Sequence, residues 1–251
     1  MITIDEIQKN IREVFEKYNI KVLTFRLDPN SRNKYAEDIS KKLDVDDDPL
    51  IENLNDLFYT VGSAQLEIGL MLISKFSAQN PEGITKKLFD NDSPLQFKLG
   101  NMHFWHHYYL TWECIYRVWE RLTDFICIIT DYKTEDKKYY FNVLLNEIKK
   151  DKRFSTLKTK RNLVGLSKHW NKVAKLRNGF SHSRSPLSTS NISVKKTSIL
   201  NSKGLPLVYV EQTMPNLIEK GKEVIQEYEY LEKAIDAVII FINEYLGFTQ
   251  Y

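Results

Sequence analysis

An arginine and a histidine lie five residues apart in the hexapeptide RNGFSH, at positions 177–182, and they have the chemistry needed to act on a phosphate ester. The planar guanidinium group of arginine binds two phosphate oxygens at once. The imidazole of histidine titrates near neutral pH, so it can take or give a proton during a reaction. We therefore predict that Arg177 binds phosphate and that His182 acts as a general acid or base.

The middle of the hexapeptide favours a turn. Asn178-Gly179 is typical of the end of a helix, where the residue after the last turn adopts a left-handed (αL) backbone conformation, so we expect the preceding helix to stop at Gly179. On an uninterrupted helix, two residues five apart point about 140° away from each other. A turn would instead let Arg177 and His182 converge. Asn178 and Ser181 would then position the phosphate or cap the turn.

The region around the hexapeptide is strongly basic. The chain as a whole carries a net charge of +3, but the stretch from Lys137 to Arg184 carries +12, with fourteen lysines and arginines against Glu147 and Asp151. Such a block is the electrostatic pattern expected for binding a polyanion, although a solvated helix face that keeps a protein soluble has the same composition. The predicted phosphate contacts are Arg161, Lys168, Lys172, Lys175 and Arg184.

A row of polar side chains interrupts the otherwise apolar helix predicted over 101–131. Its members recur at steps of three, four and seven, on one face of the helix: His106, Glu113, Arg117, Glu120 and Asp124. Polar groups on a largely buried helix need partners. They either form ion pairs with one another and with Arg121, or line the catalytic cleft, where Glu113 or Glu120 would orient the motif.

Three histidines, His103, His106 and His107, lie within one turn of the same helix. Their spacing can bind a metal, but no cysteine or glutamate completes a known pattern, so we expect no metal or cofactor. The neighbouring aromatic residues have the helical spacing of a core more than of a base-stacking surface. No glycine-rich phosphate loop is present, which argues against ATPase, kinase and dehydrogenase functions.

The rest of the chain predicts an all-α protein with a small β excursion. Apolar periodicity indicates helices over 3–18, 50–79, 101–131, 136–150, 158–177 and 216–245. Residues 21–27 alternate like a short strand, 84–100 are irregular, and 192–200 and 205–213 would pair within a polar excursion at 183–213. We expect an N-terminal extension (1–49) packed on a helical domain (50–251) with four to five main helices. Gly62 and Gly69 mark places where another helix can approach closely.

Cys114 and Cys127 lie on one predicted helix, too far apart to form a disulfide with each other, which indicates thiols in a reducing compartment. The N-terminus lacks the apolar core of a signal peptide, and the longest apolar segments are broken by charges. We therefore expect a cytoplasmic protein with no membrane partner.

The pattern formed by Arg177, Asn178 and His182, after a basic amphipathic helix in an all-α chain, resembles the signature of the HEPN domain. In architecture the resemblance covers residues 50–247. It implies a HEPN-like bundle and a metal-independent endoribonuclease that leaves 2′,3′-cyclic phosphate and 5′-hydroxyl ends. It also implies a homodimer with a composite active site. Such domains commonly act as toxins or antiviral effectors, for which an antitoxin or another regulatory protein is a further expected partner.

Two other functions are compatible with the same residues. One is a HEPN-like module without catalytic activity that binds RNA or a protein partner. The other is a dimerisation domain in which the basic block is only solvated.

Overall fold

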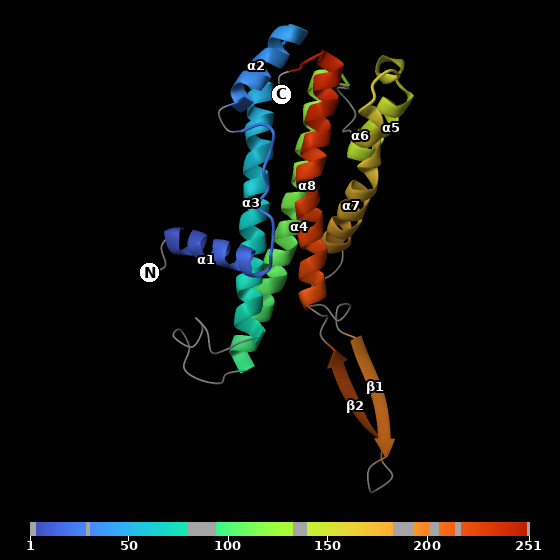
Figure 1. The fold of residues 1–251 in the computed structure, drawn as a ribbon. Coiled ribbons are helices and arrows are strands. Elements are labelled where there is room, and N and C mark those ends of the chain that lie inside the picture. The colour runs from blue at the N-terminus through green and yellow to red at the C-terminus, as the bar shows by residue number, and fades with distance from the viewer. Residues whose placement is uncertain are drawn as a thin grey trace.

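Three long helices run side by side along the molecule: α3 (Asp48–Gln79), α4 (Pro94–Thr130) and α8 (Leu217–Leu246) (Figure 1). The structure, a computed structural model, describes residues 4–28, 31–79, 94–132, 140–182, 193–200, 206–213 and 217–249. Within these ranges the fold is helical apart from one two-stranded hairpin, as the sequence predicts. α4 begins at Pro94, inside a stretch that we expected to be irregular.

The aromatic residues of α4 form the centre of the core. Because they recur at helical spacing on most sides of α4, that helix packs against α3, α8, α5 (Phe141–Lys150) and α7 (Ser167–His182). The buried aromatic side chains of α4 include Phe104, Trp105, Tyr108, Trp112, Tyr116, Trp119 and Phe125. Their interpretation as core is confirmed, and they are not available to stack on bases.

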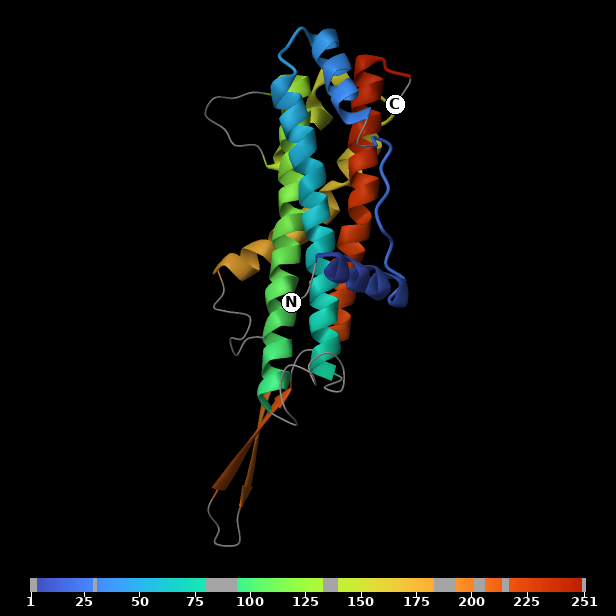
Figure 2. The same cartoon turned by 90° about the vertical axis from the view of Figure 1, so that its left-hand side faces the viewer.

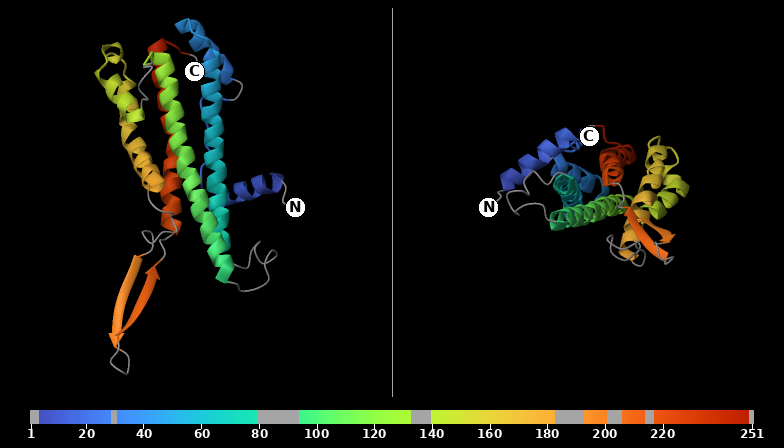
Figure 3. Two further views of the ribbon diagram at one scale, coloured as in Figure 1. Left: turned by 180° about the vertical axis from the view of Figure 1, so that it is seen from behind. Right: turned by 90° about the horizontal axis from the view of Figure 1, so that it is seen from below.

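A shorter layer lies along the side of α4 and α8. It contains α5, a single 3-10 turn (Lys152–Phe154), α6 (Lys160–Gly165) and α7 (Figures 1 and 3). The prediction of a single helix over 158–177 is therefore wrong, because the helix is interrupted at Leu166, between the end of α6 at Gly165 and the start of α7 at Ser167. Glycine favours helix interiors poorly, and the break allows both Leu163 and Leu166 to be buried.

Glu244 of α8 anchors the start of α6. Its carboxylate accepts hydrogen bonds from the amides of Lys158 and Thr159, both at 2.9 Å, and from the Thr159 hydroxyl at 2.6 Å. These bonds satisfy amide groups that a helix start leaves unpaired. The hydrogen bond from the Thr159 hydroxyl is the largest cause that holds the pKa of Glu244 below its ordinary value.

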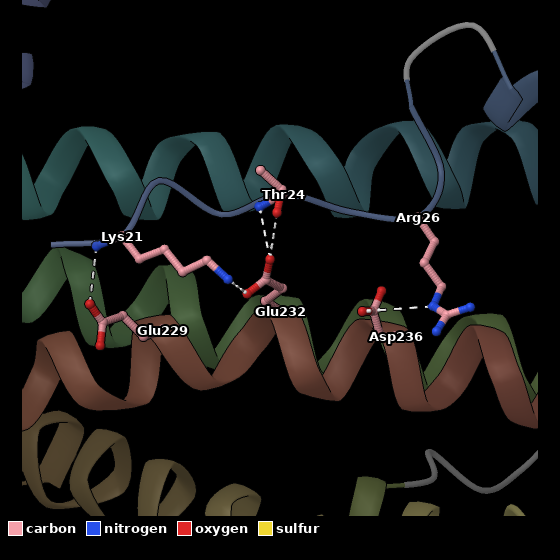
Figure 4. Close-up of polar contacts among 6 residues, drawn as sticks. All are labelled: Lys21, Thr24, Arg26, Glu229, Glu232 and Asp236. Carbon is pink, nitrogen blue, oxygen red and sulfur yellow. Dashed lines mark hydrogen bonds and ion pairs between the residues drawn. The ribbon is translucent and has the colours of Figure 1, made fainter.

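Residues 18–28, between α1 (Ile4–Lys17) and α2 (Ser31–Leu43), run along α8 without forming a helix or the predicted strand (Figure 4). Carboxylates of α8 take the place of a partner strand. Glu229 accepts a hydrogen bond from the Lys21 amide, and Glu232 accepts hydrogen bonds from the Lys21 ammonium and from the amide and hydroxyl of Thr24 (Figure 4). Burial acts to raise the pKa of Glu232, but these hydrogen bonds outweigh it and lower the pKa.

Helix α2 is not predicted from the sequence, because its apolar residues are few. Tyr35, Ala36 and Ile39 form a narrow buried stripe, and the Tyr35 hydroxyl donates a buried hydrogen bond to Asn243 of α8 at 2.9 Å. Tertiary packing therefore stabilises a helix whose own periodicity is weak.

A two-stranded antiparallel hairpin extends beyond the end of the bundle (Figure 2). Strand β1 (Ser193–Leu200) pairs with β2 (Pro206–Thr213), with Ser193 opposite Thr213 and Leu200 opposite Pro206. This pairing confirms the predicted β excursion. The rest of that excursion, 183–192 and 201–205, lies outside the described residues.

Part of α3, Asp48–Ser74, is long and apolar enough to cross a membrane by length and composition, contrary to the expectation from the sequence. Half of its most apolar window is buried inside the protein, mainly because α3 packs against α4. The core helix of a soluble protein passes the same test, so this property does not assign α3 to a membrane.

The two glycines of α3 have different surroundings. A Cβ atom built on Gly69 would lie 2.6 Å from Cγ1 and 3.2 Å from Cβ of Ile11, so Gly69 lets α1 approach α3 closely, as predicted. Gly62 is exposed and a Cβ atom there would meet nothing within 4 Å, so the same prediction is wrong at Gly62.

We expect Gly62→Ala to stabilise the protein by up to about 1 kcal/mol, because alanine favours a helix more than glycine does. Gly69→Ala should destabilise it, because the whole Ile11 side chain must move and overpacking costs about 1–3 kcal/mol. Urea denaturation of the two variants would measure both changes. Equal stabilisation by both would show that α1 does not pack closely on α3.

Candidate active site

The helix that carries the hexapeptide does not stop at Gly179. Helix α7 runs from Ser167 to His182, and Gly247 is the only glycine with a positive φ among the described residues. An Asn-Gly pair permits a left-handed cap but does not require one. The predicted turn is therefore wrong, and nothing in the backbone of one chain brings Arg177 and His182 together. The side chains of 180–182 and all of Arg184 lie outside the described residues.

Arg177 lies at the margin of the buried face of α7. Val173 and Ala174, four and three residues earlier, are buried against the bundle, whereas Asn178 and Gly179 are exposed. Residues three and four apart share a face of a helix. The Arg177 side chain is accordingly about one-third exposed, with its inner part against the protein.

Helix α4 supplies the groups that hold Arg177. Nε of Arg177 donates a hydrogen bond to Oε2 of Glu113 at 3.1 Å, and the guanidinium carbon of Arg177 lies 4.9 Å from the centre of the Tyr116 ring. The hydrogen bond to Glu113 is the largest cause that raises the pKa of Arg177, and the charge of Glu120 acts in the same direction. The structure thus brings the predicted supporting residues Glu113 and Glu120 to Arg177.

Two other members of the polar row on α4, Arg117 and Asp124, form ion pairs. Arg117 lies 3.6 Å from the second oxygen of Glu113, and Arg121 pairs with Asp124 at 3.2 Å and with Asp56 of α3. The row is exposed or half-buried along its length. The ion-pair interpretation is therefore confirmed for Glu113, Arg117 and Asp124, and the interpretation as the lining of a catalytic cleft stays a prediction.

The predicted phosphate contacts divide into two groups. Arg161, Lys168 and Lys175 are exposed and make no ion pair within the described part of the chain. Lys172 instead donates to Glu227 of α8 at 2.8 Å, and that glutamate is only 5% exposed. Glu227 neutralises Lys172, which is therefore a poor candidate for binding phosphate.

Sequence reasoning missed Glu227, which also holds a histidine. Nδ1 of His169 lies 3.0 Å from Oε2 of Glu227, and the His169 ring stacks on Tyr230 with ring centres 3.4 Å apart. The sequence does contain a signal for the burial of Glu227. It lies three residues after Val224 and four residues before Leu231, on the apolar face of α8. A charged residue in a buried row requires a partner from another element.

One hollow lies between the start of the N-terminal extended segment and α8, and Tyr230, on which His169 stacks, contributes to its lining. It has a volume of about 590 Å³ and it carries charges of both signs. Its lining residues are Asn19, Lys21, Gln226, Glu229, Tyr230, Glu232 and Lys233. None of the predicted site residues lines it.

Both cysteines are free and half-buried. Burial raises the pKa of Cys114 to about 11 and that of Cys127 to about 12. They are protonated thiols at neutral pH, which makes them poor nucleophiles and poor metal ligands.

Comparisons of the sequence with protein-family models, curated proteins and solved structures found no match.

The two glutamates that bind α7 should differ in their importance for stability. We expect Glu227→Gln to lower the free energy of unfolding by about 1–3 kcal/mol, because it leaves His169 and Lys172 without a buried charged acceptor. Glu113→Gln should lower it by at most about 1 kcal/mol, since that ion pair is partly exposed. Urea denaturation distinguishes the two, and equal losses would contradict the difference in burial.

Proposed function

We propose that this chain is a metal-independent endoribonuclease of the HEPN type, acting in the cytoplasm as a homodimer. The observation that supports it most is the placement of Arg177: a partly exposed guanidinium held by Glu113 and Tyr116, beside exposed cationic side chains of the same helix. A positioned guanidinium can hold a phosphate in a defined orientation, which a freely moving surface arginine cannot do.

In the proposed reaction, Arg177 binds the phosphate at the cleavage site and Asn178 and Ser181 help to position it. His182 takes the proton of the 2′-hydroxyl while the 2′-oxygen attacks phosphorus. The bond from phosphorus to the 5′-oxygen breaks. That oxygen leaves with a proton delivered by the imidazole of His182 in the second copy of the proposed dimer. The products are a 2′,3′-cyclic phosphate and a 5′-hydroxyl.

The continuous helix gives the proposed dimer a specific task. Because α7 does not turn at Gly179, the convergence of Arg177 and His182 is assigned to two copies whose motifs face one cleft. A two-fold axis would also bring both sets of exposed cations to the same RNA strand. A role as a toxin or antiviral effector, regulated by an antitoxin or another protein, rests on the resemblance alone.

The test is to incubate the wild-type protein, Arg177→Ala and His182→Ala with total cellular RNA in EDTA and to identify the fragment ends. We expect the wild type alone to cleave and to leave 2′,3′-cyclic phosphates, because each variant lacks one group of the reaction. Analytical ultracentrifugation of the same samples would test the dimer.

The matched control is His106→Ala, which removes an exposed histidine from α4. It should cleave like the wild type. Full cleavage by pure His182→Ala, or cleavage that EDTA abolishes, would refute the proposed mechanism.

A binding module without catalytic activity is the second candidate, and the uninterrupted helix at Gly179 favours it. In that case the exposed cations Lys168 and Lys175 would bind RNA backbone without cleavage. We expect Lys168→Glu with Lys175→Glu to weaken binding of a labelled RNA at least tenfold and to reduce its salt dependence, since fewer counterions are released. Lys172→Ala should have a smaller effect, because Glu227 already neutralises Lys172. Fluorescence anisotropy would measure both.

A further inference from the structure

Tertiary packing gives the histidine cluster of α4 a partner that the sequence does not reveal. Nδ1 of His107 lies 2.7 Å from Oε2 of Glu67 on α3, forty residues earlier in the chain. Each of these two side chains is only 17% exposed, so the contact is largely shielded from solvent. His103 and His106 are exposed on the same helical turn.

The contact with Glu67 determines which nitrogen of His107 is available. Carboxylate oxygens accept hydrogen bonds, so the contact favours the tautomer of His107 in which Nδ1 donates to Glu67 and Nε2 carries the lone pair. Metal-bound histidines have this arrangement: the ring nitrogen that does not bind the metal donates to a carboxylate, which orients the ring and raises its basicity. Glu67 therefore prepares Nε2 of His107 for a metal ion.

His103 provides a second imidazole at the right spacing. It precedes His107 by four residues, as do paired zinc-binding histidines on a helix. The two rings are nearly parallel, at 20°, with centres 6.4 Å apart. Zinc–nitrogen bonds of 2.0–2.1 Å at tetrahedral angles would place two such rings about 5 Å apart. Because His103 is exposed, its ring can move that distance without displacing packed atoms.

We propose that His103 and His107 bind one Zn²⁺ ion through their Nε2 atoms, with Glu67 as a positioning residue and water in the other positions. Imidazole nitrogens suit Zn²⁺ better than they suit Mg²⁺ or Ca²⁺. Since Glu67 belongs to α3 and both histidines to α4, the ion reinforces the packing of these two helices. The site goes beyond the proposed function: it lies about 9 Å along α4 from Glu113, six residues away, and the RNA reaction does not use it.

A second group of potential ligands provides an internal comparison. The carboxylates of Asp46, Asp47 and Asp48 lie within 4.8 Å of one another, near the start of α3. Clusters that contain only oxygen ligands suit hard cations, whereas the pair on α4 offers nitrogen. Zinc binding at the two places can therefore be distinguished by mutation.

The experiment is isothermal titration of the full chain, without a histidine tag and stripped with EDTA, with ZnCl₂. We expect one ion per chain, loss of that binding in His103→Ala and in His107→Ala, and a dissociation constant about 10–100-fold weaker in Glu67→Ala. Zn²⁺ should also raise the melting temperature of the wild type and not that of His107→Ala, because a ligand stabilises the state that binds it.

His106→Ala, His169→Ala and Asp46→Asn are the matched controls, and each should bind Zn²⁺ like the wild type. Absence of binding by the wild type would overturn the proposal. Loss of binding in His106→Ala or Asp46→Asn, with binding retained in His107→Ala, would also overturn it. Arg177→Ala should leave the titration unchanged, so this result is independent of the proposed nuclease activity.

Discussion

Burial of the aromatic residues of α4 is the constraint on which the rest of the structure depends. Trp112 and Trp119 are fully buried, and covering such side chains requires neighbours on most sides of α4. α3, α8, α5 and α7 provide that cover, whereas the polar row of α4, from His106 to Asp124, stays exposed or half-buried. Glu113, which follows the buried Trp112 in the sequence, belongs to this row. The core therefore fixes the carboxylate against which α7 places Arg177.

Carboxylates of helix α8 hold both the N-terminal extended segment and the shorter layer that contains α6 and α7. Glu232 holds the extended N-terminal segment, Glu227 holds α7, and Glu244 caps the start of α6. Each accepts hydrogen bonds from groups distant in sequence, in segments that would otherwise have unpaired amides or cations near the core. These bonds explain why an N-terminal segment without regular secondary structure still follows a defined path along α8 (Figure 4).

Burial also sorts the charges by what they can do. Lys172 and His169 are bound to a glutamate that is 5% exposed, so they belong to the structure of α7. Lys168 and Lys175, on the same helix, remain exposed. The basic block is thus not one uniform surface, and only part of it is available to a polyanion. Arg177 is intermediate, since it is anchored by Glu113 yet one-third exposed.

The sequence by itself determined the helical class, the extent of α3 and α8, the core role of the aromatic residues, and the pairing of β1 with β2. These features follow from local periodicity and composition, which a single sequence displays directly. It also identified Arg177 and the acidic row from which Glu113 comes. It was wrong where glycine was decisive, at Gly179 and Gly165, because glycine permits several conformations and its neighbours choose among them.

Only the tertiary structure decided the partners. Glu67 with His107, Glu227 with Lys172 and Glu232 with Thr24 join residues that are forty or more positions apart. Helix packing brings these pairs together, and no spacing along the chain encodes them. Tertiary structure also decided α2: its apolar periodicity is weak, and the segment is helical because Tyr35 is buried against Asn243. Local sequence set the elements, while the choice of which charge meets which depended on how the apolar faces of those elements were buried.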